Sequence, residues 1–266
     1  MQYTIAYKNA TVAYQVFGTG KETLLAFHGY GKEASSLAIL ANHVGSKFTI
    51  VSVDIFFHGD SIWADASAPS QDDWKAIVDL LLEAVDSPPK FSVFGYSIGG
   101  QVATCTAWLF GERINTLWLM AATGIGNDGF YYMAVNTAMG NQVFKAFVKK
   151  QKLISRPLHW LTTLKMLPKN LEVFVNRKID TPEKRELLYQ RWQVLKNFGV
   201  YTNQLKKRLN ANNSHTLLVY GKTDAVVNHK AAKRFAKGIN NVTMLLPDIG
   251  HHLITDEIVK EAAENL

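Results

Sequence analysis

The sequence predicts an α/β fold, with a mostly parallel, doubly wound sheet and one long helical insertion. Two observations predict this class. Short apolar segments typical of buried strands alternate with amphipathic segments typical of helices, as crossover connections between parallel strands require. A basic, helix-like block then interrupts the alternation in the second half of the chain. With 266 residues, 47% of them hydrophobic, the chain is long enough to bury a large core.

The first elements are predicted to be two strands of a hairpin. Tyr3–Lys8 and Thr11–Phe17 alternate apolar and polar side chains, and Asn9-Ala10 lies between them as a turn. Short apolar runs then predict strands that are covered on both faces: Thr23–Phe27, Phe48–Val53, Phe91–Phe94 and Thr116–Met120. Between these strands, apolar residues at helical spacing predict helices: Glu33–Val44, Gln71–Val85 and Val102–Phe110.

From about Gly124 to Asn210 no strand is predicted, and helical segments such as Phe144–Leu153 and Pro182–Phe198 follow one another. The alternation of strand and helix then resumes: Thr216–Tyr220, Lys230–Lys237, Val242–Leu246 and His252–Asn265. We therefore predict a core formed by residues 1–124 and 211–266, and an inserted helical domain of residues 125–210.

Basic residues are concentrated in this insertion. The whole chain has a net charge of +7, whereas residues 141–210 alone hold 16 Lys/Arg and four Asp/Glu, a net of +12. Solvated faces of amphipathic helices explain such a segment. The alternative is attraction of an anionic or lipid-like acyl substrate, or peripheral contact of the insertion with an anionic membrane surface. No RRM, KH, helix-turn-helix or zinc-finger signature is present, so nucleic acid is not expected as a partner.

The cysteine content and the lack of targeting patterns bear on whether the protein is disulfide-linked, metal-binding, secreted or membrane-spanning. The single cysteine, Cys105, excludes an internal disulfide framework, and no Cys/His spacing suggests a metal site. The sequence contains neither a signal-peptide pattern nor an apolar run of about 18 residues that would span a membrane. A cytoplasmic protein without metal or other cofactor is therefore expected. The sequence makes no prediction of the oligomeric state.

One motif carries nucleophilic chemistry. Gly95-Tyr96-Ser97-Ile98-Gly99 matches Gly-x-Ser-x-Gly and lies where a buried strand passes directly into an apolar helix. A serine on so sharp a turn has a strained backbone, and the flanking glycines let strand and helix approach closely. The helix N-terminus can stabilise developing negative charge. Ser97 is therefore the predicted nucleophile, and the alternative is a glycine-rich turn without chemistry.

A serine hydroxyl needs a base, and His251 is the predicted one. It follows the strand Val242–Leu246 and so lies at the carboxyl edge of the sheet, where sites form in such folds. His252 is the alternative, although it begins the last predicted helix. His28 and His58 each precede a glycine and are predicted to brace loops. The other histidines have surface or turn interpretations: His43, His159, His215 and His229.

The base in turn needs an acid that fixes the tautomer of its imidazole. Asp224 follows the strand Thr216–Tyr220, again at the carboxyl edge, and is the predicted acid. Two alternatives are weaker. Asp128 follows a strand by eight residues, and Asp248 is too close to His251 in sequence to orient it easily.

Together these motifs resemble the α/β-hydrolase family over nearly the whole chain. Phe27-His28-Gly29-Tyr30 resembles the family's His-Gly-x loop, and Asp54-Ile-Phe-Phe-His58-Gly-Asp-Ser61 resembles its Asp-x-x-x-His-Gly-x-Ser stretch. The order Ser97, Asp224, His251 is also the family's order. The resemblance implies that the backbone N–H groups of Tyr30 and Ile98 form the oxyanion hole, and that the insertion is a lid, or cap. It further implies a serine hydrolase that cleaves a carboxylic ester, or a similar acyl bond, of a small molecule through an acyl-enzyme.

Other families on this fold are weighed by single residues. Ser97 excludes haloalkane dehalogenases, which use Asp there. The menaquinone-pathway synthase, which eliminates pyruvate, shares Ser97-Ile-Gly-Gly but usually has Arg where this chain has Gln101; the basic insertion can compensate. Ring-cleavage carbon–carbon hydrolases usually have Asn at the position of Tyr96. Cofactor-free haloperoxidases share the triad and stay open, as does a ligand-binding receptor or scaffold built on the fold.

Overall fold

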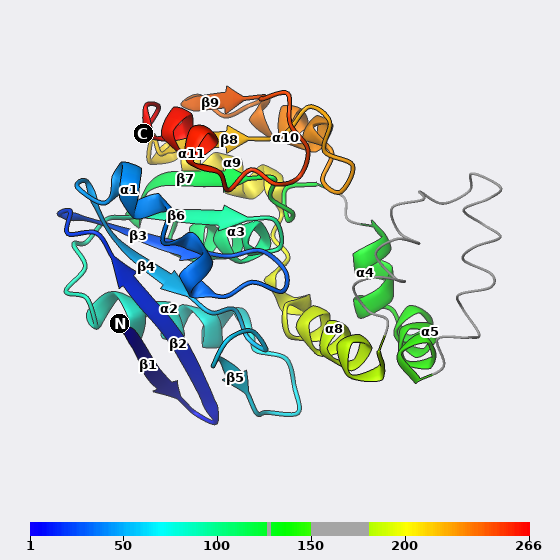
Figure 1. Ribbon diagram of the computed structural model, residues 1–266. Helices are drawn as coiled ribbons and strands as arrows, with labels where there is room; N and C mark the ends of the chain where they lie inside the picture. Colours follow the sequence, from blue (N-terminus) through cyan, green and yellow to red (C-terminus); the bar gives the residue numbers. More distant parts are fainter. Residues whose placement is uncertain (127–128, 150–180) are drawn as a thin grey trace. The chain divides into compact units, whose positions relative to one another are not determined.

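The computed structural model describes residues 1–126, 129–149 and 181–266 (Figure 1). The chain divides into two compact units. Unit 1 comprises Met1–Asn127 and Asn197–Leu266, and unit 2 comprises Asp128–Lys196.

Unit 1 is built on one sheet with the strand order β1-β2-β4-β3-β6-β7-β8-β9, and β5 pairs with β2 (Figure 1). The strands from β4 to β9 along this order pair in parallel, whereas β2 is antiparallel to its neighbours. This arrangement confirms the predicted mostly parallel sheet. The strands have these bounds: β1 Gln2–Tyr7, β2 Ala10–Phe17, β3 Glu22–Phe27, β4 Phe48–Val53, β5 Ile62–Trp63, β6 Phe91–Tyr96, β7 Ile114–Met120, β8 His215–Val219 and β9 Val242–Leu245.

Helices cover both faces of this sheet. α2, α3 and α9 pack in series on one face, and α1 and α11 pack together on the other. The described helices of unit 1 are η1 Ala34–Leu37, α1 Leu40–Val44, α2 Gln71–Glu83, α3 Gly99–Phe110, η2 Gly111–Arg113, α9 Thr202–Ala211, α10 His229–Ala236 and α11 Asp256–Ala263, and the short helix η3 Lys196–Phe198 begins at the last residue of unit 2. The central strands β3, β6 and β7 are therefore buried on both sides, as their apolar sequences predict.

Helix α2 shows how sequence signals set an element. Ser70 caps its first turn, because its hydroxyl accepts from the Asp73 amide while the Asp73 carboxylate accepts from the Ser70 amide. The apolar stripe of α2 is buried at 3.6-residue spacing: Trp74, Ile77, Val78, Leu81 and Leu82. The prediction of a helix here is confirmed to within two residues at its end.

Two predicted helices differ from the structure. The segment Glu33–Val44 is not one helix, because η1 and α1 are separated by a turn. The Ala34 carbonyl, which a continuous α-helix would use for the Ala38 amide, accepts from the Ser52 hydroxyl at 2.8 Å, and the Ala38 amide donates to the Ser35 carbonyl instead. The Ala34 amide donates to the Asp54 carboxylate at 2.6 Å and so fixes the start of η1. The last helix begins at Asp256 rather than at His252, because the Thr255 hydroxyl caps it there.

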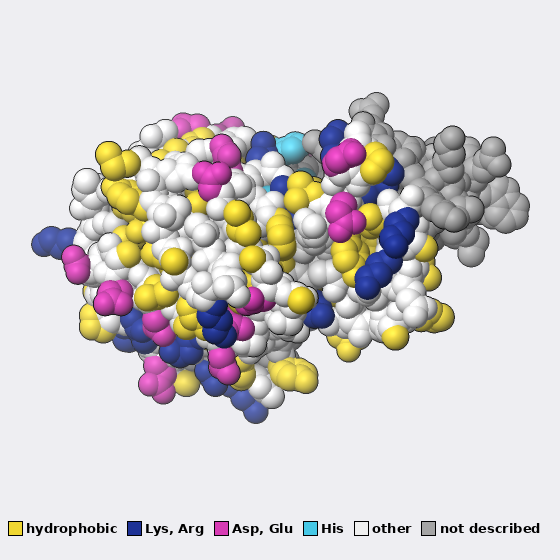
Figure 2. All heavy atoms as spheres, turned by 90° about the horizontal axis from the view of Figure 1, so that it is seen from below, with side chains coloured by type: hydrophobic (Ala, Val, Ile, Leu, Met, Phe, Trp, Pro, Cys, Tyr) yellow, Lys and Arg dark blue, Asp and Glu magenta, His cyan; other side chains and the backbone are white. Residues whose placement is uncertain are grey.

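Charged side chains on the face of the molecule seen in Figure 2 are interspersed rather than segregated by sign. Several form ion pairs on the surface of unit 1, such as Lys75 with Asp79 at 2.8 Å and Arg113 with the same carboxylate at 3.4 Å. Exposed pairs of this kind contribute little to stability, about 0–1 kcal/mol each. Among the described residues, no helix is both long enough and apolar enough to cross a membrane.

The described helices of unit 2 are α4 Gly129–Asn136, α5 Ala138–Lys149 and α8 Pro182–Val194. Its core is aromatic, since the Phe144 ring lies 5.2 Å from the rings of both Tyr189 and Trp192. The unit ends before the predicted boundary at residue 210. Helix α9 belongs to unit 1 because it buries Leu205 and Leu209 and packs beside α3.

Candidate active site

Ser97 occupies a strained turn between β6 and α3. Its φ angle is +53°, in the left-handed region that non-glycine residues rarely adopt. The turn needs glycine on both sides. A Cβ on Gly95 would lie 2.6 Å from the Ala103 Cβ atom, and a Cβ on Gly99 would overlap the Phe27 carbonyl. The local sequence therefore folds as a nucleophile elbow.

His251 lies between Ser97 and Asp224. Its Nε2 atom is 3.1 Å from the Ser97 Oγ atom, and its Nδ1 atom is 2.8 Å from the Asp224 Oδ2 atom. The three side chains come from the turn after β6, the loop after β8 and the loop after β9, so they meet at the carboxyl edge of the parallel strands. Ser97 and Asp224 are each only 9% exposed, whereas the side chain of His251 is half-buried.

The surroundings of Asp224 favour its ionised form. Burial alone would raise the pKa of this carboxyl, but the hydrogen bond from His251 and the backbone amides of Val226 and Val227 hold the pKa below its usual range. The two amides donate to Oδ1 at 2.7 and 2.9 Å, which leaves Oδ2 for His251. An ionised Asp224 can only accept, so His251 donates from Nδ1. The Nε2 atom is then free to accept the Ser97 proton.

Tyr30 and Ile98 are placed on the two segments that meet at Ser97. Ile98 directly follows Ser97 at the start of α3, and Tyr30 lies on the loop after β3. This loop runs close to Ser97, because a Cβ on Gly29 would come within 3.5 Å of the Ser97 Cβ atom. The use of the Tyr30 and Ile98 amides as an oxyanion hole stays a prediction.

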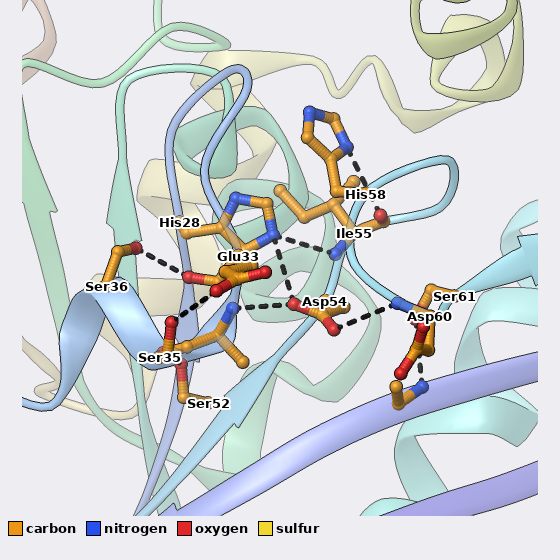
Figure 3. A network of polar contacts seen from close by, with 12 residues as sticks. His28, Glu33, Ser35, Ser36, Ser52, Asp54, Ile55, His58, Asp60 and Ser61 are labelled. Carbon is orange, nitrogen blue, oxygen red and sulfur yellow. Dashed lines mark hydrogen bonds and ion pairs between the residues drawn. The ribbon is translucent and has the colours of Figure 1, made fainter. Parts of the chain in front are cut away.

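A buried polar network ties the loop after β3 to the loop after β4 (Figure 3). The His28 Nε2 atom accepts from the Ile55 amide at 3.1 Å, and its Nδ1 atom donates to the Gly29 carbonyl at 2.9 Å. Asp54 accepts from the amides of Ala34 and Asp60 at 2.6 and 3.4 Å. Both ends of the segment that carries Tyr30 are therefore fixed.

His58 completes this network. Its Nδ1 atom lies 3.2 Å from the carbonyl oxygens of both Ile55 and Phe56, and its ring meets the rings of His28 and Tyr30 edge-on, with centroids 5.0 and 5.9 Å apart. The loop-bracing interpretation of His28 and His58 therefore agrees with their contacts.

The other candidates are placed away from this chain of hydrogen bonds or outside the described residues. His252 lies in the loop before α11 with an exposed side chain, and its ring centroid is 6.4 Å from that of His251. Asp248 is exposed on the same loop. Asp128 and His159 lie outside the described residues. In the described part of the chain, no three His, Cys, Asp or Glu side chains are grouped to hold a metal ion.

Sequence reasoning gave no role to Tyr96, which the structure places against His251. The Tyr96 hydroxyl donates to the His251 carbonyl at 2.9 Å, and the two rings stack with centroids 5.6 Å apart and planes inclined by 28°. The available signal was a large aromatic residue directly before Ser97, at the end of a strand that is predicted to be buried.

Comparison with known proteins shows the family of the chain. Residues 22–257 match the model of the alpha/beta hydrolase fold family, so the chain belongs to this family and is an enzyme of the α/β-hydrolase type. It is 25% identical over 259 residues to the dihydrolipoyllysine-residue acetyltransferase component of an acetoin cleaving system from Pseudomonas putida. This match covers 95% of the chain but only 63% of that relative's length.

Two further similarities cover most of both chains. A 2-hydroxy-6-oxononadienedioate/2-hydroxy-6-oxononatrienedioate hydrolase from Pseudomonas putida is 27% identical over 252 residues, which cover 86% of this chain and 81% of the relative. Among solved structures, a thermophilic esterase from Thermogutta terrifontis superposes with a TM-score of 0.66 at 17% identity, covering 100% of this chain and 95% of the other. The latter likeness concerns the fold alone.

Proposed function

We propose that the protein is a serine hydrolase that cleaves a carboxylic ester, or a similar acyl bond, through an acyl-enzyme on Ser97. One observation carries the proposal. The left-handed turn at Ser97 places its hydroxyl 3.1 Å from a histidine that is itself held at 2.8 Å by a buried carboxylate. This is the arrangement that converts a weakly nucleophilic hydroxyl into an attacking group.

Acylation follows from the direction of the hydrogen bonds. His251 takes the Ser97 proton on Nε2 as Oγ attacks the carbonyl carbon, and Asp224 stabilises the imidazolium that forms. The carbonyl oxygen becomes an anion, which the amides of Tyr30 and Ile98 would bind; each such donor typically contributes about 10²–10³ in rate. His251 then gives the proton to the leaving alcohol as the C–O bond breaks.

Deacylation repeats these steps with water. His251 removes a proton from water as its oxygen attacks the acyl-enzyme, and the proton returns to Ser97 Oγ when that bond breaks. Water supplies both the hydroxyl group of the acid product and the proton that replaces the one lost to the alcohol. The ester and one water account for all atoms of the acid and the alcohol, and Ser97 and His251 return to their starting protonation states.

A carboxylate-bearing substrate is favoured by two observations. The relative that is matched over 81% of its length acts, by its name, on dioates. Residues 141–210 of this chain carry a net charge of +12. If this charge selects substrate, a half-succinate ester should show a higher kcat/KM than a neutral ester of equal length. The preference should fade between about 0.05 and 0.5 M salt, as the Debye length falls to about 4 Å. An unchanged ratio would assign the charge to solvation alone.

Hydrolysis of such a dioate is the second candidate, since the name of the same relative gives a 2-hydroxy-6-oxo dioate as its substrate. A direct comparison separates the two reactions. Wild-type protein would be assayed with p-nitrophenyl esters from acetate to palmitate and with a 2-hydroxy-6-oxo dienedioate. The proposal expects the esters to be turned over faster. Faster cleavage of the dioate would establish the second candidate, and tight binding of both without turnover would indicate a receptor.

Dependence on the proposed nucleophile is tested with a fluorophosphonate probe. The probe should label wild-type protein and the control variant Ser87→Ala, but not Ser97→Ala. Ser87 is a half-buried serine in the loop after α2. Ester turnover should disappear together with the labelling. Persistent labelling or turnover in Ser97→Ala would refute the assignment.

A further inference from the structure

Tyr96 joins the nucleophile to the loop that carries the base. It is the last residue of β6 and directly precedes Ser97. Its hydroxyl donates to the backbone carbonyl of His251 at 2.9 Å, and its ring stacks on the His251 imidazole. One side chain thus contacts both the backbone and the ring of the same histidine.

The loop that carries His251 depends on such tertiary contacts. Residues 246–255 contain no helix or strand. Part of the loop is held by the segment after β8, because the amides of Lys222 and Thr223 donate to the carbonyls of Pro247 and Ile249 at 2.9 and 3.3 Å. Those contacts fix the loop relative to Asp224. The contact with Tyr96 fixes it relative to Ser97.

Tyr96 itself is rigidly placed. Strand β6 is paired on both sides, with β3 and β7, and Tyr96 is only 8% exposed. Burial raises the pKa of its phenol to about 12, and the charge of Asp224 adds to this, so the hydroxyl stays protonated and can donate at any ordinary working pH. The hydrogen bond to the His251 carbonyl is therefore not lost by ionisation of the phenol.

The same ring also contacts the loop of the predicted oxyanion hole. A Cβ on Gly29 would come within 2.9 Å of the Tyr96 Cδ1 and Cε1 atoms, so the ring lies directly against the Gly29 backbone. Gly29 precedes Tyr30, whose amide is a predicted oxyanion donor. Tyr96 therefore packs against the loop of the base and the loop of the oxyanion donor.

We propose that Tyr96 is a positioning residue. It sets the place of His251 relative to Ser97, and it spaces the loop that carries His251 from the Gly29–Tyr30 loop. This inference rests on the proposed function of Ser97, His251 and Asp224. The Tyr96 hydroxyl faces a backbone carbonyl rather than the reacting atoms. Its loss should therefore lower kcat by misplacing the base and leave substrate binding unchanged.

The test is a graded series at this position. Tyr96→Phe removes the hydroxyl and keeps the ring, and should lower kcat on a p-nitrophenyl ester about 10-fold with KM within about twofold of wild type. Tyr96→Leu also removes the stacking, and should lower kcat by about 10². The rate of fluorophosphonate labelling should fall in the same order, because labelling needs the same activation of Ser97.

Tyr220→Phe is the matched control. Tyr220 is fully buried, and its hydroxyl donates to the Ala122 carbonyl at 2.9 Å. The variant Tyr220→Phe should lose about as much thermal stability as Tyr96→Phe, because each loses one buried hydrogen bond. Its kcat should stay within about twofold of wild type. Equal kcat losses in Tyr96→Phe and Tyr220→Phe would reduce Tyr96 to a structural role, as would a kcat for Tyr96→Phe within twofold of wild type.

Ser97→Ala, assayed beside this series, separates the two proposals. If Ser97→Ala is inactive while Tyr96→Phe and Tyr96→Leu keep wild-type kcat, the proposed function stands and the role of Tyr96 is refuted. If Ser97→Ala keeps its activity, the proposed function itself fails. Should Tyr96→Leu not fold, as judged by circular dichroism, the Tyr96→Phe and Tyr220→Phe pair still decides the question.

Discussion

Two histidine–aspartate pairs lie on loops at the carboxyl ends of strands in unit 1, and their environments differ. In one pair, His251 Nδ1 is 2.8 Å from Asp224, and Nε2 faces the Ser97 hydroxyl. In the other, His28 Nε2 is 3.9 Å from Asp54, beyond hydrogen-bonding distance, and accepts instead from the Ile55 amide. The first histidine has a nitrogen available for a proton, whereas the second has both nitrogens engaged by backbone.

The carboxyl groups of Asp54 and Asp224 differ in the direction in which their pKa values are shifted. Burial raises the pKa of Asp54 despite the amides of Ala34 and Asp60, whereas the hydrogen bonds to Asp224 outweigh burial and lower its pKa. A histidine beside an aspartate is therefore not by itself a catalytic pair. The hydrogen-bond partners of the two ring nitrogens distinguish His251, the proposed base, from His28, whose nitrogens both bond to backbone groups.

The largest expected effect tests the first pair and its serine. Ser97→Ala and His251→Ala should each lower kcat by up to about 10⁶, because these side chains act as one unit. For the same reason the double variant should lose little more than either single variant. Additive losses in a steady-state assay of the three variants would show that the two residues act separately.

The next effect concerns the acid. Asp224→Asn should lower kcat by about 10⁴ with little loss of stability, because an amide can favour the wrong imidazole tautomer while its oxygen still accepts from Val226 and Val227. Asp248→Asn, on the loop of His251, is the control and should be nearly silent. A large loss in Asp128→Asn with a silent Asp224→Asn would move the acid to residue 128.

The brace should respond in the opposite way to the base. His28→Ala should lower the free energy of unfolding by about 2–4 kcal/mol, since it removes a fully buried ring and leaves the Ile55 amide without its acceptor. Its kcat should fall only about 10–100-fold, through the loop of Tyr30. His251→Ala should lower the free energy of unfolding less than His28→Ala, because the His251 side chain is partly exposed and water can reach Asp224 in its place. Urea unfolding would measure the stability of the two variants, and steady-state kinetics would measure their kcat. If His28→Ala is as inactive as His251→Ala, the two histidines do not differ in role as proposed.

The smallest effect is a difference in pH dependence between the two carboxyl groups. The lowered pKa of Asp224 stabilises the fold above the ordinary carboxyl range, and this stability is lost as pH falls through the folded-state pKa. The raised pKa of Asp54 has the opposite sign, because its stabilising effect is present at low pH and is lost as pH rises through the folded-state pKa. Urea unfolding from about pH 3 to pH 6 should therefore show differences of opposite slope when Asp224→Asn and Asp54→Asn are each compared with wild type. Parallel slopes would mean that the two environments are alike.

Much of the fold was predictable because local patterns and burial agree. The predicted strands Phe48–Val53 and Thr116–Met120 lie within β4 and β7, and the elbow motif lies where β6 meets α3. The helix predicted over Glu33–Val44 was wrong because Ser52, which comes later in the chain, donates to the Ala34 carbonyl that a continuous helix would use. No local pattern encodes such a contact.

The site divides along the same line. The meeting of Ser97, Asp224 and His251 was predictable because each follows a strand, and parallel strands bring their carboxyl ends to one edge. Their catalytic roles stay a proposal. The contact between Tyr96 and His251 joins residues 155 positions apart, and it depends on the path of a loop without regular structure. The bond from Ile55 to His28 likewise depends on how two loops pack. Sequence patterns report the element on which a residue lies, whereas its hydrogen-bond partners follow from tertiary packing.

The most direct test of the central claim is to trap the acyl group on the protein. Wild-type protein would be mixed with p-nitrophenyl acetate, quenched in acid during the pre-steady-state burst, digested and sequenced by mass spectrometry. The proposed mechanism predicts an acetyl group on Ser97, roughly one per active site, and none in Ser97→Ala or in His251→Ala quenched at the same time. A burst of p-nitrophenol with the acetyl group on another residue would contradict the assignment of Ser97 as the nucleophile.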